Sequence, residues 1–319
     1  MDVLKQVHDI GIIPVIAVDK AEQALPLCEA LVKGGLPAAE ITFRTAAGQE
    51  AIKLVAKEKP EVLVGAGTVV TVKQAKQAVE AGAKFIVSPG YYDDVVNYCV
   101  ENNIPVLPGC TNASDCMKAV NVGLKVVKFF PAEQSGGVAF IKALAPVFGQ
   151  LDFMPTGGVN TQNLNDYLGF DRIHACGGTW MVKKDLINGE KWDEIEKISK
   201  DAVKKMLNLS VAHIGINFSD EKEADDVAKK YCDMFSFDYK PGNSSIFAGT
   251  GIECNKTIGK GKNGHIAIST SDVDRAIYHL KRKGIEFDMD TYKADEKGKG
   301  KVVYLKGEFG GFAVHLLKK

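Results

Sequence analysis

The chain has 319 residues, of which 45% are hydrophobic and 25% charged, so it holds enough apolar material for one large domain and a smaller one. Its 40 basic residues balance its 40 acidic ones, which gives no electrostatic reason to expect nucleic acid or an anionic membrane as a partner. A small molecule is the expected partner. Seven cysteines without a CxxC pair, and apolar runs too short to cross a bilayer, predict a cytoplasmic protein without disulfides.

Up to about residue 205, short apolar segments alternate with amphipathic segments of roughly 10 to 15 residues, the spacing of β/α units around a parallel sheet. The expected strands are residues 11–18, 38–44, 61–69, 84–90, 104–109, 124–131, 151–158 and 172–178. Eight such units predict a (β/α)8 TIM barrel, whose site is built by the loops at the carboxyl ends of the strands. A doubly wound open sheet is the alternative, but no GxGxxG motif follows the first strand to support it.

The second expected strand carries polar side chains at every other position. Glu40, Thr42 and Arg44 share one face by the alternation of a strand, and the apolar residues between them share the other. Because the apolar face should meet the helices, the polar set is expected to point into the barrel. Charged groups in that position are costly unless they serve one another or a ligand.

The sixth expected strand contains a lysine, Lys128, within KVVKFFPAE (125–133). Alternation places Lys128 inward with Val126, and Lys125 on the opposite face. Loss of water disfavours a charged ammonium, so a buried lysine offers a free amine that attacks a ketone and forms a Schiff base. Glu40 would move the proton that carbon–carbon bond cleavage requires. The alternative is that Lys128 and Glu40 form only a buried ion pair.

Glycine pairs end the last two expected strands, in PTGG (155–158) and CGGT (176–179). These are the two loops in which barrels frequently bind phosphate with backbone N–H groups, so a phosphorylated substrate is expected. Glycine pairs also occur at strand ends for turn geometry alone, which is the alternative interpretation.

The motifs EITFRT, GAGTV, SPG, KFFPAE, PTGG and GGTW, in this order, closely resemble the 2-keto-3-deoxy-6-phosphogluconate (KDPG) and 4-hydroxy-2-oxoglutarate (KHG) aldolase family over about residues 5–205. The resemblance implies that Lys128 is the Schiff-base lysine and Glu40 the general acid/base. It implies that the substrate-binding residues are Arg44, Thr68, Pro89, Thr156, Gly157, Gly158, Gly178 and Thr179. Arg44, Thr68 and Thr156 would hold the carboxylate and carbonyl end, whereas the three glycines and Thr179, often serine in the family, would bind the phosphate.

The same resemblance implies a reaction and an assembly. The reaction is cleavage of KDPG to pyruvate and glyceraldehyde 3-phosphate, with cleavage of 4-hydroxy-2-oxoglutarate to pyruvate and glyoxylate as a further activity. The implied assembly is a homotrimer, and no metal or other cofactor is implied for this domain. The motifs do not distinguish the gluconate from the galactonate series of substrates.

The remaining residues contain an internal repeat. Residues 211–231 and 263–283 share the pattern H-I-x-I-x-x-S-D, and each copy is expected to form a strand and a helix followed by further strands. The expected plan is two βαβββ modules in a smaller α+β domain. We therefore divide the chain into a barrel over residues 1–207 and a second domain over residues 208–319.

Paired βαβββ modules with paired histidines resemble the vicinal oxygen chelate family, which includes glyoxalase I. The resemblance implies one metal ligand on the first and the last strand of each module, which corresponds to His213, Glu253, His265 and His315. The family usually has glutamate where His315 stands, and the match around Glu253 is loose. This set suits a divalent transition metal. The alternative is a binding or assembly module without metal, and His8, His174 and His279 are interpreted as structural or surface residues.

Two other functions remain open at this level. In the first alternative, the barrel is a sugar-phosphate-binding or regulatory protein, and any activity is confined to a metal-binding C-terminal domain. In the second, the whole chain is a metal-dependent isomerase or lyase. The charged run at residues 293–301 is expected to be a solvated hairpin or loop.

Overall fold

The structure of the protein is a computed structural model that describes residues 2–319. The chain forms two compact units, of which the first ends at Met206 and the second spans Leu207–Lys319. Among the described residues, no helix has the length and apolar character needed to cross a membrane.

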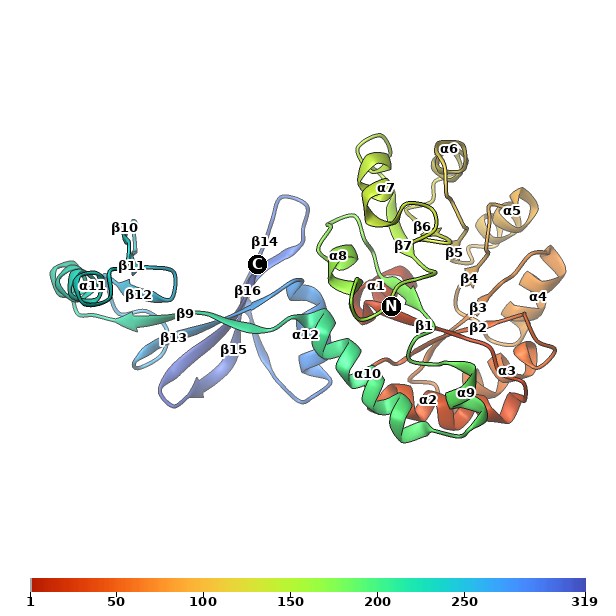
Figure 1. Ribbon diagram of the computed structural model, residues 1–319, viewed down its shortest axis with the longest axis horizontal. Helices are drawn as coiled ribbons and strands as arrows, with labels where there is room; N and C mark the ends of the chain where they lie inside the picture. Colours follow the sequence, from red (N-terminus) through yellow and green to blue (C-terminus); the bar gives the residue numbers. More distant parts are fainter. Residues whose placement is uncertain (1) are drawn as a thin grey trace. The chain divides into compact units, whose positions relative to one another are not determined.

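The first unit alternates strands and helices, as the spacing of the apolar segments predicts (Figure 1). Its strands are β1 (Ile12–Ile16), β2 (Ala38–Thr42), β3 (Leu63–Gly67), β4 (Ile86–Val87), β5 (Val106–Leu107), β6 (Val126–Phe129), β7 (Asp152–Pro155) and β8 (Cys176–Gly178). Its helices are α1 (Val3–Ile10), α2 (Ala24–Lys33), α3 (Gly48–Glu58), α4 (Val72–Glu80), α5 (Asp93–Glu101), α6 (Ala113–Asn121), α7 (Gly137–Leu144), α8 (Leu164–Leu168), α9 (Lys184–Asn188) and α10 (Trp192–Leu207), with a 3-10 turn at Ala21–Gln23. Every strand is shorter than expected, because ladder pairing stops where the chain turns into a loop.

The eight strands close into a β/α barrel. Six pair in the order β5-β4-β3-β2-β1-β8, and β6 pairs with β7. Parallel bridges between Gly109 and Lys128 and between Thr156 and Gly177 join the two sets. All ladders are parallel, and these bridges close the strands into a ring. The closed ring confirms the predicted barrel and excludes the open doubly wound sheet, whose edge strands stay unpaired.

The register of β2 explains how the barrel accommodates polar side chains. Glu40 lies opposite Val15 on β1 and Gly65 on β3, so these three positions share the inner face. Gly65 leaves space for the ring of Phe85, because a Cβ at residue 65 would lie 2.3 Å from it. Phe85 is fully buried and therefore helps to fill the interior beside Glu40.

Local sequence signals set the ends of several helices. The side chains of Thr71 and Asn112 accept hydrogen bonds from the backbone N–H groups of Gln74 and Asp115, which caps α4 and α6 at their N-termini. Gly11 ends α1 with a φ of 76°, a conformation that glycine adopts without steric cost.

The second unit contains two βαβββ modules, the element order that the repeat predicts. The first module is β9 (Ser210–Asn217), α11 (Glu221–Phe235), β10 (Tyr239–Pro241), β11 (Ser245–Ala248) and β12 (Ile252–Asn255). The second module is β13 (Gly264–Thr270), α12 (Val273–Lys281), β14 (Phe287–Ala294), β15 (Gly300–Phe309) and β16 (Phe312–Lys318). The residues between β14 and β15 form a hairpin connection, as expected for the charged run.

One sheet joins both modules, in the order β10-β11-β12-β9-β13-β16-β15-β14. The first strands of the modules, β9 and β13, are antiparallel neighbours at its centre, and each pairs in parallel with the last strand of its own module. First and last strands of both modules are therefore adjacent, which brings four corresponding positions together.

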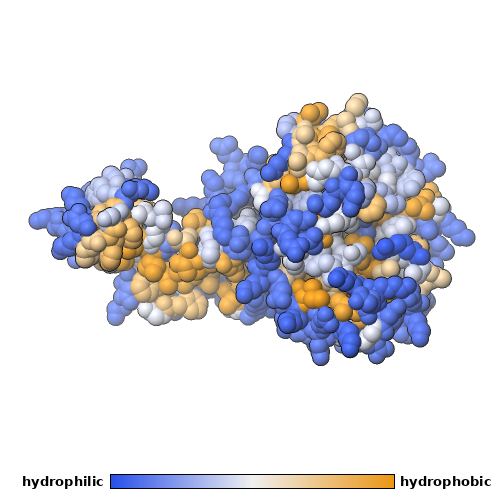
Figure 2. All heavy atoms as spheres, in the orientation of Figure 1, coloured by the Kyte–Doolittle hydropathy of each residue, from blue (hydrophilic) through white to orange (hydrophobic). Residues whose placement is uncertain are grey.

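The repeated S-D dipeptide begins a helix in each module. Asp220 accepts a hydrogen bond from the backbone N–H of Glu223, and Asp272 accepts one from Arg275, so both aspartates are N-caps. Helix α11 packs through Ala224 and Ala228 on Ile246 and Cys254 of the sheet. Hydrophobic residues also gather on the surface in the region of β9, β13 and β15 (Figure 2).

Candidate functional sites

Lys128 and Glu40 meet inside the barrel. Lys128 Nζ lies 3.3 Å from Glu40 Oε1, and the side chains are 6% and 0% exposed. Lys128 Nζ also lies 5.2 Å from the centroid of the Phe130 ring. Period-two alternation on β2 and β6 thus brings the two predicted reactive groups into contact.

The Glu40 carboxylate has unused hydrogen-bonding capacity. Its Oε2 is buried and has no hydrogen-bond partner within residues 2–319. Gly67 borders the same group, since a Cβ there would lie 2.4 Å from Oε1. A buried carboxylate oxygen without a partner costs free energy, so it marks a place where a substrate proton or hydroxyl would bind.

Residues after β2 and β3 extend the site along the carboxyl ends of the strands. Thr42 Oγ1 donates to the Ile16 carbonyl at 2.8 Å, and Arg44 Nε donates to Thr42 Oγ1 at 3.1 Å. Arg44 is exposed, so its outer nitrogens face solvent at this end of the barrel. Thr68 has a φ of 57°, which is strained for a β-branched residue and is often found at functional sites.

The loops after β7 and β8 hold the predicted phosphate-binding residues. Gly157 and Gly158 adopt φ values of 96° and 82°, and neither N–H donates to another residue in the described part of the chain. Thr156 Oγ1 is buried without a partner in that same part of the chain. A Cβ at Gly177 would lie 2.2 Å from this hydroxyl. These groups therefore have hydrogen-bonding capacity that the described residues do not use.

Two predicted residues have additional structural roles. A Cβ at Gly178 would lie 1.8 Å from the Trp180 ring, so side-chain packing alone requires glycine there. Pro89 follows β4, and its carbonyl lies where a Cβ of Gly109 would be, at 2.2 Å. Thr179 is exposed at the end of β8.

A contact that no sequence pattern predicts joins the segment after β6 to α8 and to the loop after β7. The Tyr167 hydroxyl donates a hydrogen bond to Glu133 Oε1, and the Glu133 N–H donates to the Gly157 carbonyl at 3.1 Å. Glu133 thereby connects the segment after Lys128 to the glycine loop. No periodic pattern links residues 133 and 167. The only sequence signal for this segment is that Glu133 is the last residue of the KFFPAE motif.

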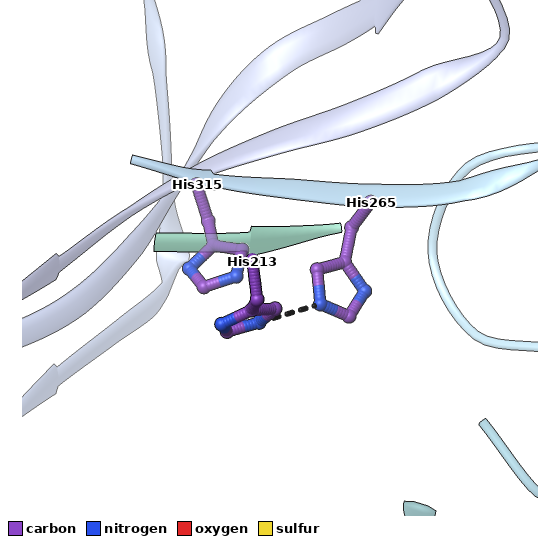
Figure 3. Close-up of side chains that lie close together, drawn as sticks. All are labelled: His213, His265 and His315. Atoms are coloured by element: carbon purple, nitrogen blue, oxygen red, sulfur yellow. Dashed lines mark hydrogen bonds between the residues drawn. The ribbon is translucent and has the colours of Figure 1, made fainter. Parts of the chain in front are cut away.

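A second polar cluster lies on the sheet of the second unit. Imidazole nitrogens of His213, His265 and His315 all lie within 4.8 Å of one another, and the three rings point toward a common centre (Figure 3). Glu253 Oε2 lies 3.1 Å from His213 Nε2 and 3.0 Å from His265 Nε2. The four predicted side chains, one from each of β9, β12, β13 and β16, are therefore brought together.

The surroundings of this cluster favour deprotonated ligands. Burial alone would raise the pKa of Glu253, but hydrogen bonds from His213, His265 and Ser245 outweigh it and hold the pKa well below its ordinary value. Burial lowers the pKa of His315 to about 4, so this imidazole is neutral at pH 7. Neutral imidazoles and an ionised carboxylate are the forms that bind a divalent cation.

The other histidines lie outside these clusters. His174 Nε2 donates to the Leu4 carbonyl at 2.8 Å, and its ring lies edge-on to His8 at 5.4 Å between centroids. These contacts link α1 to the chain before β8, which agrees with a structural role. His279 is buried on α12.

Comparisons with known proteins concern the first unit. Residues 3–198 match the sequence model of the family described as KDPG and KHG aldolase. A 2-dehydro-3-deoxy-phosphogluconate aldolase of Haemophilus influenzae is 44% identical over 201 residues, which make up 63% of this chain and 95% of the relative. The KHG/KDPG aldolase of Escherichia coli is 42% identical over 192 residues, 60% of this chain and 90% of its own.

A solved structure of KDPG aldolase from Legionella pneumophila, with pyruvate captured at low pH as a covalent carbinolamine intermediate, is also similar. It aligns with a TM-score of 0.62 and 36% identity, over 63% of this chain and 98% of that chain. The chain thus spans nearly the full length of these proteins and has a second unit in addition.

Proposed function

The chain belongs to the KDPG and KHG aldolase family, and we propose that its first unit cleaves 2-keto-3-deoxy-6-phosphogluconate to pyruvate and glyceraldehyde 3-phosphate through a Schiff base on Lys128. The protein is an aldehyde-lyase. The contact between Lys128 Nζ and Glu40 Oε1, at 3.3 Å in a buried setting, is the observation that carries the proposed mechanism.

Lys128 supplies the nucleophile. Its neutral amine attacks the C2 ketone to give a carbinolamine, which loses water to form an iminium. The iminium is an electron sink, because its positive nitrogen accepts the pair released from a neighbouring bond. The nearly complete burial of both side chains excludes water that would otherwise compete for these groups.

Glu40 moves the proton. Its carboxylate takes the proton from the C4 hydroxyl while the C3–C4 bond breaks, which yields the aldehyde and an enamine on Lys128. Glu40 then returns the proton to C3, and water hydrolyses the resulting pyruvate iminium to free the lysine. The unpartnered Glu40 Oε2 supports this role, since a substrate hydroxyl would satisfy it.

The remaining predicted residues hold the substrate. Arg44 would bind the carboxylate with its planar fork, and Thr68, Pro89 and Thr156 would border the carboxylate and carbonyl end. The phosphate would be held by Gly157, Gly158, Gly178 and Thr179. The same chemistry cleaves 4-hydroxy-2-oxoglutarate to pyruvate and glyoxylate, because both substrates carry a ketone and a hydroxyl two carbons apart.

Trapping with borohydride tests the lysine. The full chain incubated with pyruvate and borohydride should carry one reduced pyruvate adduct, located by peptide mass spectrometry on Lys128. Lys128→Met should lose both the adduct and KDPG cleavage. Lys125→Met is the matched control, since Lys125 is exposed on the same segment, and it should keep both. Binding of the substrate without any adduct would instead favour a sugar-phosphate-binding or regulatory barrel, and an adduct on another lysine would refute the assignment to Lys128.

Assembly and compartment stay predictions. The resemblance implies a homotrimer, which light scattering of the purified protein would measure as three times the chain mass. A reducing, cytoplasmic setting agrees with seven free cysteines, of which six are buried.

We further propose that the second unit is a glyoxalase-like domain of the vicinal oxygen chelate type. Two βαβββ modules that pair through their first strands support this assignment. The cluster of His213, Glu253, His265 and His315, one side chain from each first and last strand, supports a divalent transition metal at its centre. Three imidazoles and one carboxylate suit such a cation.

Three ligand atoms of the cluster lie so close together that their contacts cannot all be ordinary hydrogen bonds unless they share a proton or surround a cation. The side chains therefore fit a cation. His213 Nε2 and His265 Nε2 lie 3.1 Å apart and both approach Glu253 Oε2. When bound, the metal would supply Lewis acidity toward a ligand oxygen. Ser245 donates a hydrogen bond of 2.6 Å to Glu253 Oε1, whereas the two histidines contact Oε2, so the serine orients the carboxylate.

Elemental analysis tests the metal site. Purified full-length protein should contain about one divalent transition metal per chain, as expected for a single four-ligand site. The variant His213→Ala, His265→Ala should lose it. His8→Ala is the control, because His8 lies in the other unit, and it should retain the metal. Equal metal content in the double variant and the wild type would refute the proposed ligands.

A further inference from the structure

A cavity of about 310 Å³ lies beside the histidine cluster of the second unit. It is lined by residues of β14, β15 and β16 and of the loop before β13, among them Lys260, Asp288, Tyr304 and Ala313. Cross-strand pairing places Tyr304 opposite His315 and Asp288 opposite Tyr304, so all three side chains share the face that carries the cluster. The volume is at the lower end of the range for ligand pockets, which indicates a small ligand.

Tyr304 forms a wall common to the cavity and the cluster. Its ring centroid lies 4.8 Å from that of His315, with an angle of 37° between the planes. A molecule that contacts the cluster would therefore meet the Tyr304 side chain next and reach the cavity beyond it.

Lys260 is the cation of this cavity that lies against the Tyr304 ring. Its Nζ lies 5.4 Å from the Tyr304 ring centroid and 3.0 Å from Asp288 Oδ2. An ammonium group has three N–H donors, and Asp288 uses one of them. The side chains of Lys260 and Asp288 are 50% and 32% exposed, so their ion pair is weak and leaves the lysine able to bind a second anion.

The other cation of the lining is less suitable. Lys306 Nζ lies 3.2 Å from Glu286 Oε2, and both side chains are well exposed, at 62% and 73%. A ligand held there would remain in water, where the attraction between charges is small. Lys260 lies against the aromatic wall and is the better placed of the two.

We propose that this cavity is an anion subsite, in which Lys260 and Tyr304 bind the negatively charged end of a small molecule whose other end contacts the histidine cluster. The inference rests on the metal site proposed above. The charged end of the ligand determines specificity. Lys260 recognises this end, and Tyr304 separates it from the cluster.

The test compares two acids that differ only in a distal charge. The full chain is loaded with Co²⁺, and its visible spectrum is followed during titration with 2-hydroxyglutarate or with 2-hydroxypentanoate, which lacks the second carboxylate. Hydroxy acids are used because they have no ketone to react with Lys128. Because its distal carboxylate would accept a hydrogen bond from Lys260, we expect 2-hydroxyglutarate to bind about tenfold more tightly than 2-hydroxypentanoate.

Variants assign the effect to the subsite. Lys260→Met should remove the difference between the two acids without loss of Co²⁺. Tyr304→Phe keeps the ring that separates the charged end from the cluster but lacks the hydroxyl donor to the anion, so it should reduce the difference. Lys301→Met, an exposed lysine of β15 outside the cavity, should keep it. If Co²⁺ binds but the wild type does not distinguish the acids, or Lys260→Met still does, the subsite is refuted alone. If Co²⁺ does not bind, the metal site fails and the subsite with it.

Discussion

Gly67 leaves the space that the Glu40 carboxylate occupies. A Cβ at residue 67 would lie 2.4 Å from Glu40 Oε1 and 2.8 Å from Glu40 Cγ, closer than any real contact. Glu40 is fully buried, so it has no room to move away from the added methyl without losing its position beside Lys128. The glycine of GAGTV thus determines where the proposed proton carrier lies.

Gly67→Ala should therefore separate amine chemistry from proton transfer. We expect kcat for KDPG cleavage to fall by about 100-fold, the lower part of the range for a lost general acid/base. Borohydride trapping of pyruvate should still modify Lys128. Gly149→Ala is the control, because position 149 has open space for a Cβ and no positive φ. Equal kcat values for both variants would contradict the role of the glycine.

Glu40→Gln should retain Schiff-base formation and lose proton movement. The amide keeps the shape of the carboxylate but has no basic oxygen, so the exchange of pyruvate methyl hydrogens with deuterium should fall by roughly 10²- to 10⁴-fold. Proton NMR of pyruvate in D₂O measures this rate. Glu61→Gln, at an exposed glutamate before β3, should exchange at the wild-type rate. Unchanged exchange in the Glu40 variant would assign the proton to another group.

The barrel was predictable because its signals are local. Eight apolar segments at regular spacing indicate β/α units, and the alternation within β2 and β6 places Glu40 and Lys128 on the inner face without knowledge of any contact. Strand ends were less predictable. In the sequence, Arg44 continues the alternation of polar and apolar residues of β2, but ladder pairing stops at Thr42.

Contacts that depend on register were not predictable. Tyr304 meets His315 only because β15 and β16 pair at those residues, and neither side chain carries a sequence signal for the other. The Tyr167 hydrogen bond to Glu133 joins α8 to the segment after β6, across 34 residues of sequence. Glu253 was a loose match in the sequence, and the pairing of β12 with β9 is what brings it to His213.

Tyr167→Phe tests the link between the Lys128 segment and the glycine loop. Burial raises the pKa of Tyr167, so its hydroxyl is a neutral donor to Glu133 over the whole working pH range. Loss of a hydrogen bond to a carboxylate should lower the free energy of unfolding of the first unit by about 1 to 2 kcal/mol. Urea unfolding followed by tryptophan fluorescence measures it, since both tryptophans, Trp180 and Trp192, lie in this unit.

The same variant should affect binding more than chemistry. If Glu133 holds the glycine loop, KM for KDPG should rise several-fold while borohydride trapping of pyruvate, which has no phosphate, stays at the wild-type level. Tyr98→Phe on α5 is the matched control and should leave stability and KM unchanged. A Tyr167 variant with wild-type stability and KM would show that the hydrogen bond has no part in either.

The metal-free second unit should lose stability as the pH falls from 7 to 5. His315 has a pKa of about 4 in the folded protein, below its ordinary 6.5, so between these values the unfolded chain binds the additional proton. Falling pH therefore favours unfolding, by at most about 1.4 kcal/mol per pH unit for this residue. The lowered pKa of Glu253 adds a loss only below its ordinary value of 4.5, outside this window. The measurement uses chelator-treated protein. Because both tryptophans lie in the first unit, unfolding of the second unit is the urea transition that far-UV circular dichroism detects and tryptophan fluorescence does not. Its midpoint should move to lower urea concentration as the pH falls. His315→Leu should flatten the dependence, and equal slopes in the two proteins would refute the assignment to His315.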